Sequence, residues 1–118
     1  MIEKNTQYGN ISFSSSVVAQ MAGGAATECY GVVGMASQKM LKDGFYELLK
    51  KDNFSKGIIT KEGLTGLIVD IYIFVGYGIK ISEVVFEVQK KVKYVLERTL
   101  DVRVEEVNVY VQGIKVIE

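Results

Sequence analysis

The sequence predicts an α+β fold, in which two β-α-β-like units form a mixed, mostly antiparallel sheet with helices packed on it. A pattern of strand, serine-led helix and strand occurs twice, beginning at Tyr8 and again at Tyr77. An apolar hairpin separates the two copies, as expected for an α+β layer fold. Of the 118 residues, 48% are hydrophobic, which is enough for one buried core. We therefore expect a single domain over residues 1–118.

The first unit begins with a short strand at Tyr8–Phe13, after which three serines at 14–16 offer N-caps for a helix at about 15–29. Apolar side chains recur at helical spacing in this stretch. The pair Gly23-Gly24 lies inside the helix, where each glycine costs about 1 kcal/mol relative to alanine. We expect the close approach of another backbone to be the reason for the pair.

Gly31 is expected to end the first helix, because glycine tolerates the conformation that commonly follows a helix C-terminus. The short apolar stretch Val32–Ala36 then predicts a strand. A second helix is predicted at Lys39–Asn53, with its apolar side formed by Phe45 and two leucines.

The segments Lys56–Lys61 and Leu64–Val75 predict a hairpin around Glu62-Gly63. The second arm is apolar on both faces from Leu67 onwards. A strand that is covered on both faces has this pattern, as does one with a face reserved for another subunit. Val75-Gly76-Tyr77-Gly78 then predicts a turn that ends the strand.

The second unit contains the longest predicted helix, at about 83–99, with Ser82 as its N-cap and Glu83 near its positive end. Its buried stripe is predicted to consist of Val85, Val88, Val92, Val95, Leu96 and Thr99. In the last strand the valine alternation slips by one residue at Glu105-Glu106, which indicates a β-bulge or a break.

The chain contains no histidine, which removes histidine-activated nucleophiles and the commonest zinc ligand. We therefore expect no enzyme, no catalytic or metal-binding residue and no cofactor. Cys29 lies on the apolar stripe of its helix and is interpreted as a small buried core thiol. Asp70 is the one charge in an apolar strand, and we expect a carboxylate paired with a lysine. The alternative role for Asp70 is proton transfer.

Fourteen basic and fourteen acidic side chains cancel, whereas nucleic-acid binders usually carry a basic face. Gly31–Gly34 matches the G-x-x-G spacing of KH domains, but its central valines favour a helix stop and strand entry. A nucleic-acid-binding module on a KH-like α+β core remains the alternative function, and it predicts binding through Lys90, Lys91 and Lys93. A third hypothesis, a small-molecule regulator of lipid or cell-wall synthesis, requires a pocket that the sequence does not reveal.

No signal peptide and no membrane-spanning segment is visible in the sequence, and a lone cysteine suits a reducing compartment. We therefore expect a cytoplasmic protein that does not insert directly into a membrane.

The candidate site for protein interaction lies on the charged side of the longest helix. Phe86 is placed well away from the apolar stripe, and aromatic side chains are favoured anchors at protein contacts. Together with its neighbours it defines the candidate residues Phe86, Lys90, Lys93, Tyr94 and Glu97. An isolated exposed aromatic residue is also ordinary on protein surfaces, and that simpler interpretation stays open.

Several segments occur along the chain in one order, namely Ile11–Val18, Met21–Ala26, Gly31–Met35, Leu48-Leu49, Ser55–Gly57, Val69–Ile73, Tyr77-Gly78, Ile81–Val85 and Val107–Val111. Taken together, and with no single motif deciding, these segments make nearly the whole chain, about residues 8–114, resemble the alkaline shock protein family of Gram-positive bacteria, also described as envelope stress response proteins.

The resemblance implies a non-enzymatic cytoplasmic protein linked to cell-envelope homeostasis and to alkaline or general stress. It also implies a membrane-anchored protein partner, which would place the chain at the membrane periphery, and association with itself. The family's usual proline before the second helix is replaced by Ser82. The chain is similar to the short, housekeeping-type members and lacks the charged extensions of longer ones.

Overall fold

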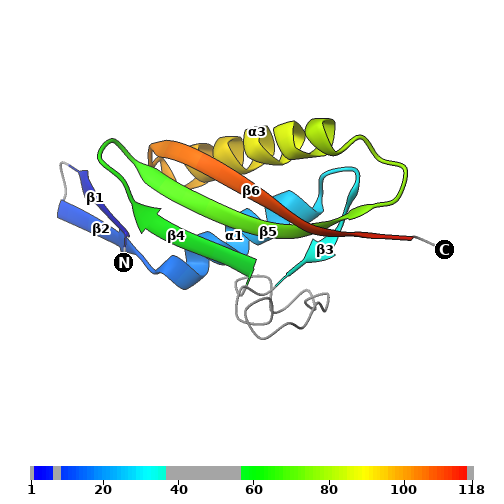
Figure 1. The fold of residues 1–118 in the computed structure, drawn as a ribbon. Helices are drawn as coiled ribbons and strands as arrows, with labels where there is room; N and C mark the ends of the chain where they lie inside the picture. The colour runs from blue at the N-terminus through cyan, green and yellow to red at the C-terminus, as the bar shows by residue number, and fades with distance from the viewer. Residues whose placement is uncertain (1, 7–8, 37–56, 117–118) are drawn as a thin grey trace.

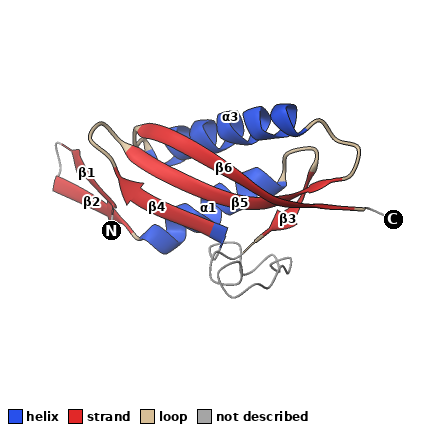
Figure 2. Ribbon diagram, viewed as in Figure 1, coloured by secondary structure: helices blue, strands red, loops and turns tan. Residues whose placement is uncertain are grey.

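The computed structural model describes residues 2–6, 9–36 and 57–116, and for residues 2–13 it describes the backbone only. The elements along the chain are β1 (Ile2–Thr6), β2 (Gly9–Phe13), α1 (Ser15–Thr27), β3 (Val32–Met35), β4 (Ile58–Glu62), β5 (Leu67–Gly76), α3 (Ile81–Leu100) and β6 (Val104–Lys115) (Figures 1 and 2). The helix predicted at 39–53 lies outside the described residues. Neither described helix is long and apolar enough to cross a membrane.

Strand β5 is the centre of a mixed four-stranded sheet. Strand β6 pairs with it in parallel along one side. On the other side β4 pairs antiparallel with its first half and β3 with its second half. The predicted α+β class and mixed sheet are therefore confirmed, as is the hairpin, whose strands end at Glu62 and begin at Leu67.

The two strand–helix–strand units differ in topology. The prediction that a strand begins the second unit at Tyr77 is wrong, because residues 77–79 form a turn and the strand before α3 is β5. In this unit β5 and β6 are parallel neighbours joined through α3, so both strands belong to one sheet. In the first unit β2 pairs antiparallel with β1 in a separate two-stranded sheet, while β3 joins the main sheet. The sequence pattern indicated β2 but contained no sign of β1.

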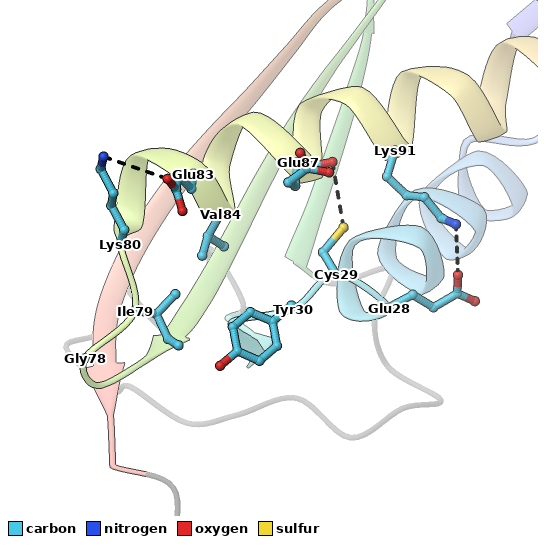
Figure 3. Close-up of a pocket in the computed structure, with 10 residues that line it drawn as sticks. All are labelled: Glu28, Cys29, Tyr30, Gly78, Ile79, Lys80, Glu83, Val84, Glu87 and Lys91. Carbon is cyan, nitrogen blue, oxygen red and sulfur yellow. Dashed lines mark hydrogen bonds and ion pairs between the residues drawn. The ribbon is translucent and has the colours of Figure 1, made fainter.

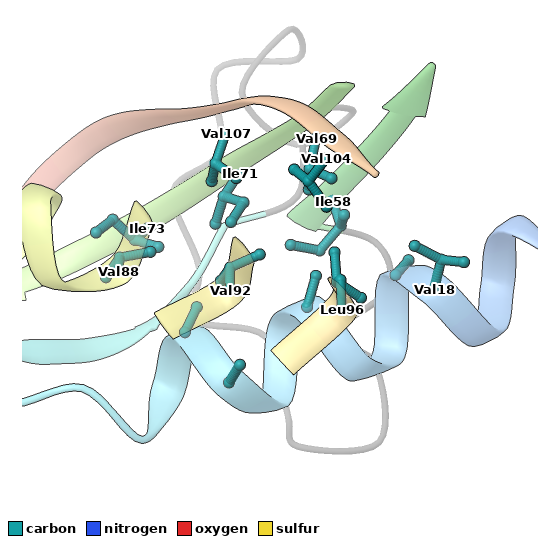
Figure 4. Packing of buried hydrophobic residues seen from close by; sticks show 14 of the residues in the cluster. Val18, Ile58, Val69, Ile71, Ile73, Val88, Val92, Leu96, Val104 and Val107 are labelled. Atoms are coloured by element: carbon teal, nitrogen blue, oxygen red, sulfur yellow. The ribbon is translucent and has the colours of Figure 1, made fainter. Parts of the chain in front are cut away.

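Both described helices contribute to one hydrophobic core with the main sheet. Fully buried side chains of α3 and β5 meet those of α1, as the close view of Val18, Ile71 and Leu96 shows (Figure 4). On β5 the core side is formed by Val69, Ile71, Ile73 and Val75, none of which is exposed to solvent. The strand predicted to be apolar on both faces is therefore the central strand of the sheet.

The N-terminus of α1 follows the sequence prediction. Ser14 is the N-cap, and its Oγ accepts a hydrogen bond from the backbone N–H of Val17 at 3.1 Å. That bond satisfies one of the free N–H groups of the first turn. The helix ends at Thr27 with Glu28 as its C-cap, so the prediction that Gly31 ends it is wrong; Gly31, with a φ of 93°, lies in the turn into β3.

The N-terminus of α3 differs from the prediction. The helix begins at Ile81 with Lys80 as its N-cap, and no side chain caps it. The carbonyl of Lys80 already accepts hydrogen bonds from Glu83 N–H at 3.1 Å and Val84 N–H at 3.2 Å. Ser82 therefore lies in the first turn, and its prediction as the cap is wrong.

The buried side of α3 is also rotated relative to the prediction. It runs at a spacing of four residues through Val84, Val88, Val92, Leu96 and Leu100. Of the predicted stripe, Val85 and Val95 are half-buried and Thr99 is exposed. The helix packs against α1 as well as the sheet, so its buried side is set by two surfaces that the sequence periodicity does not locate.

The bulge predicted in the last strand is present. Leu67 pairs with Val104 but Ile68 pairs with Glu106, which leaves Glu105 as an extra residue. The Glu105 carboxylate accepts hydrogen bonds from the Thr65 backbone N–H at 2.7 Å and hydroxyl at 2.6 Å. These bonds tie the β4–β5 turn to β6, and they lower the pKa of Glu105.

The glycine pair in α1 gives a prediction about stability. The close backbone approach expected of the pair is absent at Gly24, where an added Cβ would meet no atom of the described residues within 4 Å. Gly24→Ala should therefore raise the free energy of unfolding, by up to about 1 kcal/mol, through better helix propensity. Chemical denaturation followed by circular dichroism measures the change. A clear loss of stability would contradict the open surroundings of Gly24.

Candidate protein-interaction site

The candidate site lies on the solvent side of α3, away from the buried side formed by Val84, Val88, Val92, Leu96 and Leu100. Phe86 is 58% exposed and Tyr94 is 59% exposed, so both rings present most of their surface to solvent. They lie eight residues apart, which places them on one broad face of the helix together with Lys90 and Lys93. The structure thus leaves two large aromatic side chains on the surface of a helix whose other side is fully packed.

Each exposed ring has a cation beside it on the same helix. Lys90 Nζ lies 5.6 Å from the centroid of the Phe86 ring, and the guanidinium carbon of Arg98 lies 5.9 Å from that of Tyr94. Cation–π contacts at exposed positions contribute about 0.5–1 kcal/mol. The two rings and their neighbouring cations make this face of the helix both aromatic and basic.

Glu97 has a different role from the other candidates. Its Oε2 accepts a hydrogen bond from the backbone N–H of Val104 at 3.1 Å, and the side chain is half-buried. It therefore links α3 to the first residue of β6. The structure supports Glu97 as a structural contact and leaves Phe86, Lys90, Lys93 and Tyr94 as the exposed candidates.

A shallow groove of about 350 Å³ runs between α3 and the start of β6. Phe86, Lys90 and Lys93 line it, whereas Tyr94 and Glu97 do not. The remaining lining residues, which the sequence did not indicate, are Gln89, Glu105, Glu106 and Val107. Gln89 Nε2 donates to the carbonyl of Val107 at 3.0 Å, so a hydrogen bond joins α3 to β6 between two of the lining residues.

A second groove, of about 610 Å³, opens on the other flank of α3, where the end of α1 meets the β5–α3 turn (Figure 3). Its charged rim is largely paired: Lys91 Nζ lies 3.5 Å from Glu28 Oε2, and Lys80 Nζ lies 3.8 Å from Glu83 Oε1. Ion pairs at such exposed positions contribute little to stability.

Cys29 lines this second groove and is half-buried; the thiol predicted to be a buried core residue packs against the edge of the core. Its Sγ lies 3.6 Å from the carbonyl oxygen of Ala25 and 3.8 Å from that of Glu87 (Figure 3). Burial raises the pKa of the thiol, which keeps it in the neutral, weakly nucleophilic form at neutral pH. The chemistry expected of Cys29 is therefore that of a packing side chain.

Asp70 has the structural partners that the preferred interpretation required. It is buried, at 5% exposure; its Oδ2 lies 3.1 Å from Lys61 Nζ, and its Oδ1 accepts from Asn108 Nδ2 at 3.0 Å. The hydrogen bond to Asp70 raises the pKa of Lys61. The carboxylate thus joins β5 to both neighbouring strands, β4 and β6, rather than facing a substrate groove.

The glycine motif that suggested a KH-type clamp is also explained by the fold. Gly31 is the turn residue, with its carbonyl accepting from the Gly76 N–H at 2.9 Å, and Gly34 is buried in β3. Neither is presented on a basic loop. Within the described residues, no group of three or more carboxylate, cysteine or histidine side chains could hold a metal ion.

Comparison with known proteins extends over almost the full chain. Residues 3–116 match the model of a family of alkaline shock proteins that is described as having a "cell envelope-related function". The chain is 50% identical to the Bacillus subtilis protein YloU and 47% identical to the Streptococcus pyogenes protein Spy1614, with 98% of this chain and 96% of each relative covered. A second Bacillus subtilis protein, YqhY, is 28% identical over 98% of the chain and 84% of its own length. No solved structure matches the chain.

Proposed function

Because the chain belongs to the alkaline shock protein family, whose description is a cell envelope-related function, we propose that it serves the envelope as a non-catalytic binding protein in the cytoplasm. The single observation that carries the proposed mechanism is the exposed aromatic and basic face of α3. We call this the α3 face and define it by Phe86, Lys90, Lys93 and Tyr94. A single cysteine in a half-buried, unpaired state suits the reducing compartment that the proposal assigns.

The side chains of the α3 face indicate which chemical groups the partner surface should carry. Two exposed rings supply apolar anchors, and aromatic residues often carry the largest share of binding energy at protein contacts. Lys90, Lys93 and Arg98 place positive charge beside them; Lys90 Nζ also lies 3.9 Å from Glu87 Oε1, and the Glu97 carboxylate accepts a hydrogen bond from the β6 backbone. The proposed partner surface is therefore apolar at its centre and acidic at its rim. The family resemblance implies a membrane-anchored protein, and we propose that such a protein carries this surface.

A photo-crosslinking experiment in living cells tests the proposal. A photoreactive residue at Lys90 should capture one specific membrane-associated protein, whereas the same residue at the exposed Leu64 should not. Phe86→Ala/Tyr94→Ala should weaken binding of the captured protein by about 1,000-fold, since the variant removes two anchors that contribute about 2 kcal/mol each.

The control variant is Tyr30→Ala/Tyr77→Ala, which removes two comparably exposed aromatic side chains from outside the α3 face. It should bind the captured protein as the wild type does. Equal affinities of the wild type and the Phe86→Ala/Tyr94→Ala variant, with both folded, would refute the proposed mechanism and leave the family assignment untouched.

A further inference from the structure

Strand β6 has an unpaired edge in the part of the chain that the structure describes. Its strand partner is β5, and the strands lie in the order β6, β5, β4 across the front of the molecule (Figure 1). It is twelve residues long, from Val104 to Lys115. An open edge of this length is a template for pairing with another strand.

The hydrogen bonds of β5 show which β6 groups point outwards. The Tyr72 carbonyl accepts from Ala36 N–H on the β3 side, so Ile71 and Ile73 direct their backbone groups towards β6. Their register partners, Val109 and Val111, therefore direct theirs away from the sheet. At the start of β6 the outward groups are partly satisfied, since Gln89 bonds to the Val107 carbonyl and Glu97 to the Val104 N–H. Among the described residues, none is recorded as bonding to the outward backbone groups in the middle of the edge, at Val109 and Val111.

We infer that this edge binds a second copy of the chain, with the two β6 strands antiparallel about a two-fold axis at Tyr110. In this arrangement Val109 of each copy faces Val111 of the other as a hydrogen-bonded pair, which uses the outward backbone groups of both residues. The result is one continuous sheet through both copies, and the two-fold axis closes the assembly as a dimer. The inference uses the edge of β6 and does not rest on the proposed function of the α3 face.

Charge complementarity selects this register. Glu106 lies near one end of the strand, and its carboxylate is 3.4 Å from Asn108 Nδ2, on the sheet face that carries Asp70. Lys115 lies at the other end, with its ammonium 5.0 Å from the Phe74 ring centroid on the same face. The bulge near Gln112 brings Lys115 level with Glu106 of the second copy, at both ends of the interface. Opposite charges in such cross-strand positions stabilise pairing.

The aromatic residues at the centre fit the same axis. Tyr110 is 43% exposed, and its ring stacks on Tyr72 with centroids 5.0 Å apart and an interplanar angle of 19°. A two-fold axis at Tyr110 brings the Tyr110 rings of both copies together on one face. The stack then continues from one copy to the other, and aromatic cross-strand pairs are favourable.

Sedimentation velocity of the purified full chain over a range of concentrations tests the inference, with charge variants as the probe. Glu106→Lys and Lys115→Glu should each raise the dimer dissociation constant about tenfold or more. Either change turns both Glu106–Lys115 pairs of the two-fold interface into pairs of like charge. The exchange variant Glu106→Lys/Lys115→Glu should restore the dimer. A wild-type chain that stays monomeric up to about 100 µM overturns the inference, and so does a dimer indifferent to both single changes.

Cysteine crosslinking tests the position of the axis. In a Cys29→Ala background, Tyr110→Cys should form a disulfide-linked dimer on mild oxidation, since residues at the axis have Cα atoms within disulfide range. Asn108→Cys should not, because its two copies would lie roughly 13 Å apart along the strands. Crosslinking at residue 108 without crosslinking at residue 110 overturns the proposed register.

Discussion

Replacing Leu96 by alanine should lower the free energy of unfolding by about 2–5 kcal/mol. Leu96 has no exposed surface and belongs to the core cluster that joins α3, α1 and the sheet (Figure 4). Truncation removes buried methyl groups and leaves a cavity among Val18, Val92 and their neighbours, which lie on elements that cannot all move inwards. Urea unfolding followed by circular dichroism, with comparison of the slopes of the transitions, measures the loss.

Leu64→Ala is the matched control, because it makes the same chemical change at a fully exposed leucine in the β4–β5 turn. Its effect should lie within about 0.5 kcal/mol of zero. Similar losses at the two positions would mean that Leu96 is not the packed core residue described above.

Gly31→Ala should have the second large effect, a loss of about 2–5 kcal/mol in the free energy of unfolding. Gly31 has a φ of 93°, a conformation that costs an L-residue about 1–2 kcal/mol. A Cβ at this position would also lie 2.6 Å from Val84 Cγ2 and 2.8 Å from Ile79 Cγ2. Overpacking of this kind typically costs a further 1–3 kcal/mol or so. Val84 is buried in the first turn of α3, and the turn between α1 and β3 packs directly against it.

Gly78→Ala separates the cost of the backbone conformation from the cost of overpacking. The free energies of unfolding of both variants are compared by thermal or urea unfolding. Gly78 has a similar φ of 82°, but a Cβ there would meet no atom of the described residues within 4 Å. Its loss should be about 1–2 kcal/mol, from the backbone conformation alone. If the two variants lost the same stability, the contact between Gly31 and Val84 would have no energetic weight.

The candidate site was predictable in part, because its residues lie on one helix. The 3.6-residue period of α3 separates Phe86 and Tyr94 from the buried valines without any knowledge of the fold. The groove partners Glu105, Glu106 and Val107 come from β6, which reaches α3 only through the parallel β5–β6 pairing. Glu97 could not be assigned for the same reason, since its partner is the backbone of Val104. Sequence periodicity identifies an exposed face but not what lies next to it.

The repeated pattern of strand, helix and strand shows most clearly where the sequence stops being informative. Local patterns determined the α+β class, the Ser14 cap, the hairpin and the bulge at Glu105, because each depends on neighbouring side chains and turn chemistry. Tertiary contacts decided that β2 pairs with β1, that β5 and β6 run parallel, and that Lys80 rather than Ser82 is the N-cap of α3. Strand pairing and burial are set by residues far apart in the chain, and a local pattern repeated twice can therefore meet two different surroundings.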